Sequence, residues 1–376
     1  MKKLSILGST GSIGDSTLKV IDNLKGQFKI KYLSANNNFK KLADQALRYN
    51  PEYVIIDKEF YQDLKDILGT SKIKILTIEE GLDQATSDKN VDIVVNAIVG
   101  SFGLRPTINA AKNGKIIALA NKESLVMAGE NVKSLMKEFG SKIIPIDSEH
   151  SAILQSLNGE EYSAINKIIL TASGGPFRDR KDSLEDVSIE DALAHPNWSM
   201  GDKISIDSAT MMNKGFELIE AVHLFDLGPE RIEIIIHPES IIHSMVEFID
   251  GSVIAQLGLP DMMVPIQYAL TYPERKKLDL PKLDLHKLGT LNFFDPNTKM
   301  FPAINVAIEA IKEGGTVPVV LNAVNEIMVY KFLKGKIKFT DIVKNVEEEI
   351  SKHKKIKDPT IDQIFEVNDE IWKRLH

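Results

Sequence analysis

The feature that most constrains the fold is a short apolar strand that runs directly into a glycine turn and then a helix. Residues Leu4 to Leu7 have the pattern of a buried strand, Gly8 to Gly14 carries three glycines, and apolar residues then recur with helical spacing. This is the context of a dinucleotide-binding βα unit, in which glycines let the backbone approach a pyrophosphate and the helix N-terminus offers free N–H donors. The spacing is G-x-x-G-x-x-G rather than G-x-G-x-x-G, so a bare turn remains the alternative.

The same alternation continues through the first third of the chain. Short apolar runs at 30–35, 53–56, 91–97 and 116–120 stand between amphipathic segments. Such a pattern predicts a Rossmann-like, doubly wound parallel sheet, whose ligands bind at the carboxyl ends of the strands. Asn121, Lys122 and Glu123 follow the last of these runs. Lys122 is interpreted either as a catalytic cation or as the start of a solvated helix.

Composition narrows the class of function. A chain of 376 residues should hold two or three domains, and a net charge of -7 gives no basic footprint for nucleic acid. The absence of Cys excludes disulfides and thiolate metal sites. No apolar run reaches the roughly 20 residues of a membrane span, and no signal or transit segment is recognised. We therefore expect a cytoplasmic enzyme with no membrane or nucleic-acid partner.

The loop after the second strand bears on the choice of cofactor. An NAD-preferring site usually has an acidic residue here, which binds the ribose 2′-hydroxyl. This chain has Ser34, Asn36 and Asn38, which offer neutral donors and do not repel a 2′-phosphate. The loop therefore predicts NADP, although no arginine stands here. An asparagine-rich turn without a ligand is the alternative.

Two carboxylates follow the apolar run that ends at Ile146. If that run is a strand, Asp147 and Glu149 point to the same side and converge just past its end. Two anionic groups facing one point need a proton or a divalent cation between them. The alternative is that Asp147 or Ser148 caps a helix that begins near Ala152, with Glu149 in its first turn. The residues alone leave both interpretations open.

The middle third predicts a lid and an anion site. The polar segment of about residues 178–201, which ends in the motif His195 to Gly201, has the length and composition of an active-site lid, with a disordered linker as the alternative. We expect a strand over 204–207, followed by a helix capped by Ser208. On that helix Asn213, Lys214 and Glu217 lie on neighbouring faces and, with Ser208, suit a phosphomonoester. An ordinary surface ion pair between Lys214 and Glu217 is the alternative.

The last third of the chain predicts helices but contains no candidate catalytic or ligand-binding residues. Residues 273–300 form an extended connector, and four helical patterns follow, the last with Asp358 and Pro359 as its first residues. The expected domains are therefore a cofactor-binding domain (1–147), a metal- and substrate-binding domain (148–272), the connector, and a C-terminal helical bundle (301–376).

Six motifs together resemble the 1-deoxy-D-xylulose 5-phosphate reductoisomerase family of the non-mevalonate isoprenoid pathway. The resemblance covers the whole length, and the motifs occur in the family's order: Gly8 to Gly14, Ala120 to Ser124, Asp147 to His150, Ser173 to Phe177, His195 to Gly201 and Asp207 to Gly215. It implies isomerisation of 1-deoxy-D-xylulose 5-phosphate and its reduction by NADPH to 2-C-methyl-D-erythritol 4-phosphate. It also implies a homodimer.

The resemblance further implies a role for individual residues. Asp147, Glu149 and Glu217 would hold a Mg, Mn or Co ion, and Lys122 would stabilise negative charge on the reacting oxygens. The substrate phosphate would lie on Ser173, Ser208, Asn213 and Lys214, and the rest of the substrate on Ser148 and His195. The residues along NADPH would be Thr10, Gly11, Ser12, Ile13, Asn36, Asn38, Asn121, Glu123 and Gly201. Position 36 is glycine in many family members, so Asn36 is a departure beside the expected 2′-phosphate.

Two other functions remain as alternatives. A plain NADP-dependent dehydrogenase of the homoserine or semialdehyde type would not need three carboxylates. A regulator that senses NADPH without turnover would need neither a metal nor a sugar phosphate.

Overall fold

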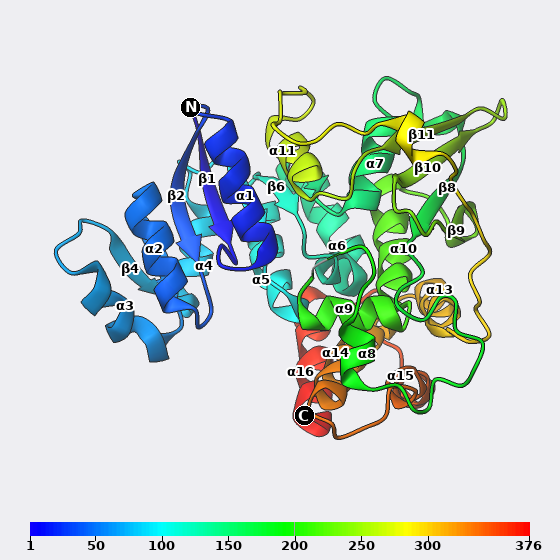
Figure 1. Ribbon diagram of the computed structural model, residues 1–376. Coiled ribbons are helices and arrows are strands. Elements are labelled where there is room, and N and C mark those ends of the chain that lie inside the picture. Colours follow the sequence, from blue (N-terminus) through cyan, green and yellow to red (C-terminus); the bar gives the residue numbers. More distant parts are fainter. Residues whose placement is uncertain (199) are drawn as a thin grey trace. The chain divides into compact units, whose positions relative to one another are not determined.

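A seven-stranded parallel sheet forms the centre of the first of two units in the computed structural model, which describes residues 1–198 and 200–376 (Figure 1). This unit comprises residues 1–124, 132–151 and 261–280. The strand order is β4-β3-β2-β1-β5-β6-β7, so the order reverses beside β1, as in doubly wound sheets. The predicted Rossmann-like sheet is confirmed. The strands are β1 (Lys2–Leu7), β2 (Phe28–Ser34), β3 (Tyr53–Ile56), β4 (Lys74–Thr77), β5 (Ile93–Asn96), β6 (Ile116–Leu119) and β7 (Lys142–Pro145).

Helices cover this sheet, which is why its strands are apolar on both faces. Leu4, Ile6 and Leu7 of β1 are all fully buried, as a central parallel strand requires. The helices are α1 (Ser12–Asn23), α2 (Phe39–Tyr49), α3 (Tyr61–Leu68), α4 (Ile78–Ser87), α5 (Leu104–Lys112), both ends of α6 (Glu123–Phe139) and α11 (Met263–Thr271), with 3₁₀ turns η1 (Lys58–Phe60) and η2 (Gly100–Gly103).

Helix α11 returns to this unit from far along the chain. It packs on α1, β6 and β7, and the Asn23 side-chain amide donates to Gln267 Oε1 at 3.0 Å. The four segments expected from the sequence divide the chain more finely than these two units, and their boundaries stay a prediction.

A buried ion pair lies at the amino-terminal edge of the first unit's sheet. Lys31 Nζ lies 2.6 Å from Asp88 Oδ2, and the Tyr32 hydroxyl donates to the same oxygen at 2.7 Å. Burial alone would raise the pKa of Asp88, but the hydrogen bonds from Lys31, the Asn90 backbone and Tyr32 lower it overall. Asp88 is therefore ionised in the folded protein, and the fold favours its charged form.

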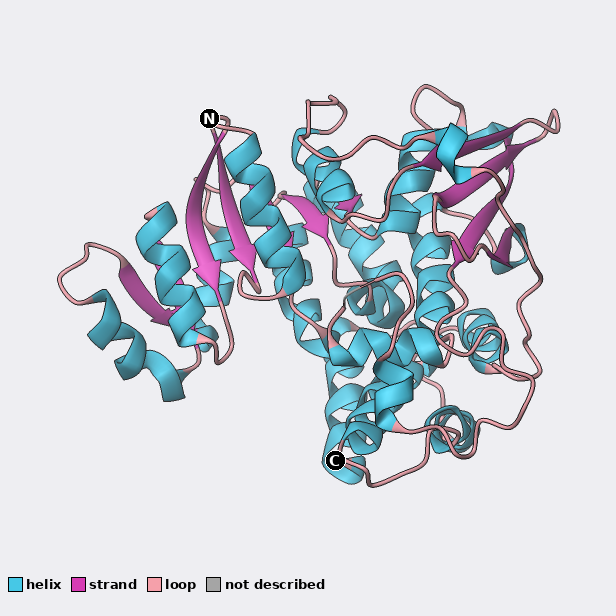
Figure 2. Ribbon diagram, in the orientation of Figure 1, coloured by secondary structure: helices cyan, strands magenta, loops and turns pink. Residues whose placement is uncertain are grey.

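The second unit combines a small sheet with many helices (Figure 2). It comprises residues 125–131, 152–260 and 281–376, and its sheet has the order β11-β10-β8-β9. Strands β8 (Ile165–Ala172) and β9 (Ile232–Ile236) are parallel, whereas β10 (Ile242–Phe248) runs antiparallel to β8 and to β11 (Val253–Leu257). Asp250 and Gly251 lie in the turn that joins β10 to β11, and Gly251 has a φ of +85°.

The helices of this unit include the predicted C-terminal bundle. They are the end of α7 (Ser148–Ser156), α8 (Ile189–Leu193), α9 (Asp202–Ala209), α10 (Met212–Phe225), α12 (Leu285–Leu288), α13 (Ala303–Glu313), α14 (Val317–Leu333), α15 (Asp341–Lys352) and α16 (Ile361–Leu375), with 3₁₀ turns η3 (Tyr162–Ala164) and η4 (Pro229–Arg231). The predicted start of the last helix is wrong by two residues. Thr360 is the N-cap and forms a capping box with Gln363, which satisfies the first N–H groups better than Asp358 could from outside.

The strand predicted over 204–207 is wrong, because these residues form helix α9. Their alternation of isoleucine with polar residues resembles a strand, but the polar positions are buried. Lys203 Nζ lies 2.8 Å from Asp207 Oδ2 one helical turn later, and Asn325 of α14 donates to Asp207 Oδ1 at 2.7 Å. These contacts stabilise a helix whose polar side is enclosed by protein.

The predicted cap at Ser208 is wrong as well. Ser208 lies in the last turn of α9, and α10 begins after Met211, whose φ of +63° is left-handed. Among the described residues, no helix is both long and apolar enough to cross a bilayer.

Candidate functional site

In the glycine loop between β1 and α1, a side chain at Gly8 or Gly14 would collide with the protein backbone, whereas one at Gly11 would not. A Cβ at Gly8, where φ is +79°, would lie 2.6 Å from the Ala97 carbonyl oxygen, and one at Gly14 would lie 2.3 Å from the Ser9 carbonyl oxygen. At Gly11 the nearest atom would be the Gly8 carbonyl oxygen, 3.5 Å away. Gly11 is exposed and precedes the first turn of α1. The space at Gly11 therefore fits a ligand that approaches the backbone closely, as a dinucleotide pyrophosphate does.

Ser34 shapes this loop instead of facing a ligand. Its side-chain oxygen accepts from the Gly8 N–H at 2.9 Å, and its carbonyl accepts from the Ser9 N–H at 2.8 Å. Ser34 is buried, whereas Asn36 and Asn38 are exposed beside the loop. Only the asparagines of the predicted neutral set can therefore meet a cofactor from this loop.

Asn121 and Glu123, both predicted to contact the cofactor, are buried at the end of β6. The Asn121 amide donates to the carbonyls of Ile98 and Gly100 at 2.8 Å, so it orders the loop after β5. That loop exposes Val99 and Phe102 at the same edge of the sheet. Neither residue was among the predicted site residues, although a glycine-bearing loop directly after a strand is a signal for such a position.

Lys122 and Asp147 form a buried ion pair in the first unit. The Lys122 ammonium contacts Asp147 Oδ2, and their side chains are only 8% and 12% exposed. This arrangement contradicts the alternative in which Lys122 is solvated. A buried ammonium held beside a carboxylate is a strong hydrogen-bond donor toward an oxygen that carries negative charge.

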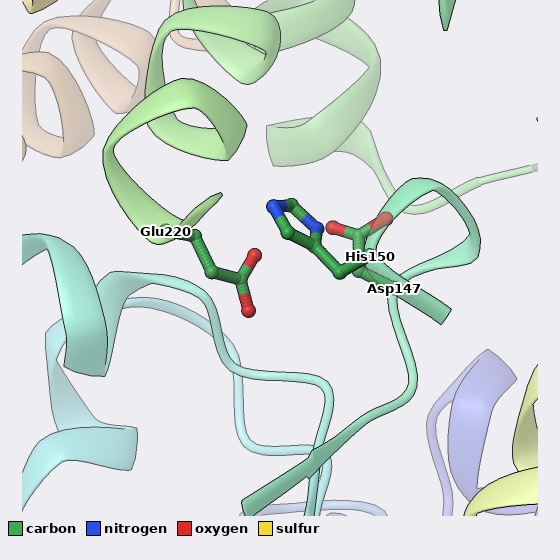
Figure 3. A group of neighbouring side chains, drawn as sticks. All are labelled: Asp147, His150 and Glu220. Atoms are coloured by element: carbon green, nitrogen blue, oxygen red, sulfur yellow. The ribbon is translucent and has the colours of Figure 1, made fainter. Parts of the chain in front are cut away.

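The start of α7 shows that Asp147 and Glu149 can be a helix cap and first-turn residue and still offer oxygens to a cation. The Asp147 carbonyl accepts from the Ser151 N–H at 2.8 Å, the first hydrogen bond of a helix that begins at Ser148 and not at Ala152. Asp147 thus has the N-cap position, and Glu149 is in the first turn, where the Ser148 hydroxyl donates to its Oε2 at 2.6 Å. Figure 3 shows Asp147 and His150 projecting from this short segment of the chain.

The donor set of this segment fits a hard divalent cation. Asp147 and Glu149 each offer a carboxylate oxygen, and these two atoms lie within 4.8 Å of each other. Both side chains are partly accessible. Oxygen ligands in a partly open arrangement are what Mg²⁺ and Mn²⁺ bind.

The residues Asn213, Lys214 and Glu217, predicted from the sequence to lie on neighbouring faces of one helix, are on α10 in the second unit. The Asn213 amide donates to Glu217 Oε1 at 2.5 Å, and the Lys214 ammonium contacts Glu217 Oε2 and donates to the Thr171 carbonyl at 2.6 Å. The Lys214 and Glu217 side chains are 5% and 1% exposed, so the alternative of an ordinary surface ion pair is wrong. Glu220, also drawn in Figure 3, follows on the same helix and is buried.

His195 and Ser173 lie together in the same unit. The His195 Nδ1 accepts from the backbone N–H groups of Asn197 and Trp198, at 3.2 and 3.0 Å, so the ring proton is on Nε2. Nε2 therefore donates to the Ser173 hydroxyl at 3.0 Å. Burial lowers the pKa of His195, and the nearby Arg178 lowers it further, which favours this neutral tautomer.

The Ser173 loop packs directly on the end of α9. A Cβ at Gly175, which has a φ of +69°, would lie 2.7 Å from the Ser208 carbonyl oxygen. Gly201 is exposed and precedes α9 as its N-cap. Within this unit the structure thus brings Ser173, His195 and Ser208 to one region, which sequence order alone does not do.

Comparison with known proteins gives a consistent result along the chain. The family model described as 1-deoxy-D-xylulose 5-phosphate reductoisomerase matches residues 4–129, its C-terminal domain model matches 143–225, and the DXP reductoisomerase C-terminal domain model matches 257–374. The reductoisomerase of Chloroherpeton thalassium is 50% identical over 370 residues, which cover 98% of this chain and 96% of the relative. That of Bacillus subtilis strain 168 is 50% identical over 371 residues, which cover 98% and 97%.

Solved structures agree with the sequence relatives. A crystal structure of DOX-P reductoisomerase in complex with NADPH, fosmidomycin and magnesium superposes with a TM-score of 0.96 at 42% identity, covering 100% of this chain and 97% of the other. The reductoisomerase from Zymomonas mobilis in complex with NADPH gives a TM-score of 0.92 at 42% identity, covering 100% and 98%.

Proposed function

The chain belongs to the 1-deoxy-D-xylulose 5-phosphate reductoisomerase family, and from that premise we propose which of its residues perform the family's reaction. It is an NADPH-dependent oxidoreductase that also uses a divalent cation. It converts 1-deoxy-D-xylulose 5-phosphate to 2-C-methyl-D-erythritol 4-phosphate. The observation that carries the assignment of residues is the buried Lys122–Asp147 pair beside Glu149, because a plain dehydrogenase or a sensor has no use for it.

The carboxylates Asp147, Glu149 and Glu217 are proposed to hold the cation, with Mg, Mn and Co all suited to the donor set. When bound, the ion supplies Lewis acidity toward the substrate's carbonyl and hydroxyl oxygens. Asp147 orients the Lys122 ammonium, which donates to the same oxygens as negative charge develops on them.

The substrate's phosphate is proposed to lie on the second unit. Lys214 provides a buried positive charge, and Ser173, Ser208 and Asn213 provide neutral polar groups. His195, whose Nε2 donates to the Ser173 hydroxyl, is proposed to contact the rest of the substrate together with Ser148. The proposed lid is the segment of residues 178–201. It includes Ser199, which lies outside the described residues.

NADPH is proposed to lie along Thr10, Gly11, Ser12, Ile13, Asn36, Asn38, Asn121, Glu123 and Gly201. Asn121 would act chiefly by ordering the loop after β5. We further propose that the enzyme works in the cytoplasm.

The proposed function is tested by NADPH oxidation at 340 nm with 1-deoxy-D-xylulose 5-phosphate, with and without EDTA. Consumption of NADPH that EDTA abolishes and Mn²⁺ restores is the expected result. Turnover that persists in EDTA would support the plain dehydrogenase. NADPH binding without consumption would support the sensor.

Two substitutions in the glycine loop should have different consequences. Gly11→Ala is expected to weaken NADPH binding by about tenfold or more without lowering the melting temperature, because the added methyl enters only the space left for the cofactor. Gly14→Ala should destabilise the fold, since its methyl would meet backbone atoms of Ser9. Calorimetric titration and thermal unfolding measure the two effects. Normal NADPH affinity in Gly11→Ala would contradict the assignment of this loop.

A homodimer is proposed through the edge strand β11. Among the residues that the structure describes, this strand pairs with β10 on one side only, and it exposes Val253, Ile254 and Leu257. Exposed apolar side chains on an unpaired strand edge favour association with a second copy.

Ile254→Glu should therefore shift the protein from dimer to monomer at micromolar concentration, measured by light scattering after gel filtration. Ile67→Glu on α3, where the isoleucine is 44% exposed in the first unit, is the matched control and should leave the dimer unchanged. A dimer that survives Ile254→Glu would rule out this surface.

A further inference from the structure

A lysine that the sequence motifs do not include lies between the glycine loop and the loop after β2. Lys41 is in the first turn of α2, and its backbone N–H donates to the capping side chain of Asn38 at 3.2 Å. Its ammonium donates to the Thr10 carbonyl at 2.9 Å and forms an ion pair with Asp15 in the first turn of α1. The Lys41 and Asp15 side chains are 38% and 34% exposed, so a ligand can reach them.

We propose that Lys41 is the cation that selects NADPH over NADH, by binding the 2′-phosphate. This inference rests on the proposed use of NADPH. The 2′-phosphate of a dinucleotide bound to this fold lies beside the loop after the second strand. Here that loop offers only neutral asparagines, and the Ser34 hydroxyl already accepts from the glycine loop. Lys41 is a positive group that the fold brings to this place, with its ammonium at the Thr10 carbonyl of the glycine loop.

The chemistry of the ammonium supports this role. It has three N–H donors, and the contacts with Thr10 and Asp15 use two of them. The N-terminus of α2, which is 11 residues long, adds a positive partial charge on the same side. A phosphate oxygen can therefore take the third donor without breaking the other two contacts.

A substitution of Asp15 offers a second test, in which NADPH affinity should rise instead of fall. Gln45 Nε2 donates to its Oδ1 at 3.1 Å, so the carboxylate stays beside Lys41 and offsets its charge. Asp15→Asn keeps the shape of the side chain and removes that charge. The variant should bind NADPH several-fold more tightly and NADH equally well, because only the 2′-phosphate faces Lys41.

The decisive experiment is calorimetric titration of the purified protein with NADPH and NADH, without substrate. Lys41→Gln should weaken NADPH binding by about 10- to 100-fold, the scale of one charge-assisted hydrogen bond, and NADH binding by less than about twofold. Lys41→Arg should retain the preference for NADPH. Lys40→Gln is the matched control, since Lys40 is exposed on the same turn and its Nζ lies 6.0 Å from the Phe39 ring. It should change neither affinity.

The outcomes separate the possibilities. If Lys41→Gln weakens both cofactors equally, Lys41 only supports the glycine loop, and the inference is wrong. If it retains the wild-type preference for NADPH, the 2′-phosphate is bound elsewhere, and the inference is also wrong. A wild type that binds both cofactors equally would instead contradict the proposed use of NADPH itself.

Discussion

Glu217→Gln is expected to lower turnover by about three orders of magnitude, the scale of losing one group that acts on developing charge. The carboxylate is almost fully buried, and its two oxygens accept from Asn213 and Lys214. Glutamine has the same shape but presents an N–H₂ to one of these two donors. The variant should therefore lose a proposed metal ligand and leave the Lys214 ammonium buried without its anion.

Three measurements separate this effect from general damage. Mn²⁺ affinity, followed by electron paramagnetic resonance, should fall, whereas NADPH affinity should stay within about twofold because the ion does not hold the cofactor. Glu349→Gln is the matched control, since Glu349 is also a mostly buried glutamate, paired with Arg374 at 2.5 Å in the C-terminal bundle. The control should keep full turnover. Unchanged Mn²⁺ affinity in Glu217→Gln would remove Glu217 from the metal site.

Asp88→Asn is expected to destabilise the folded chain by about 3–5 kcal/mol, the scale of breaking a buried ion pair from one side. The Lys31 and Asp88 side chains are 8% and 14% exposed, so the lysine would keep its charge without its main partner. Urea unfolding followed by circular dichroism measures the loss. Glu52→Gln is the control, because Glu52 is 40% exposed and lies 3.5 Å from the same lysine, and it should cost less than about 1 kcal/mol.

The stability lost in Asp88→Asn should decrease as the pH falls into the acid range. The folded pKa of Asp88 is lower than its unfolded value of about 3.9, so its stabilisation is fully present above that value. It is lost as the pH falls through the folded pKa. The difference in unfolding free energy between wild type and Asp88→Asn should therefore be constant near neutral pH and shrink below about pH 4. A difference that grows in acid would contradict the ion-pair explanation.

The sites that could be predicted from the sequence are those formed by residues near one another along the chain. Asp147 and Glu149 are two positions apart, and Asn213, Lys214 and Glu217 lie within one helical turn, so local geometry alone makes them neighbours. The glycine loop was likewise predictable, because a strand, a turn and a helix in sequence determine where its N–H groups point.

Predictions failed where contacts with distant segments decide the outcome. Residues 204–207 alternate like a strand, but Asn325 from α14 and Lys203 enclose Asp207 in a helix. Ser34 was predicted to offer a neutral donor beside the cofactor, but its hydroxyl oxygen accepts from the Gly8 N–H in the loop after the neighbouring strand. In both cases a partner 26 or more residues away satisfies the polar group.

The sequence by itself therefore determined the parallel sheet of the first unit, the position of its glycine loop and the proximity of Asp147 to Glu149, since periodicity and short spacing encode them. Only the tertiary structure decided that Lys214 and Glu217 form a buried pair beside β8, that His195 meets Ser173, and that Lys41 reaches the glycine loop. Burial and hydrogen-bond partners depend on which segments meet in space. The pattern of one segment cannot specify the polar groups that another segment will bring to it.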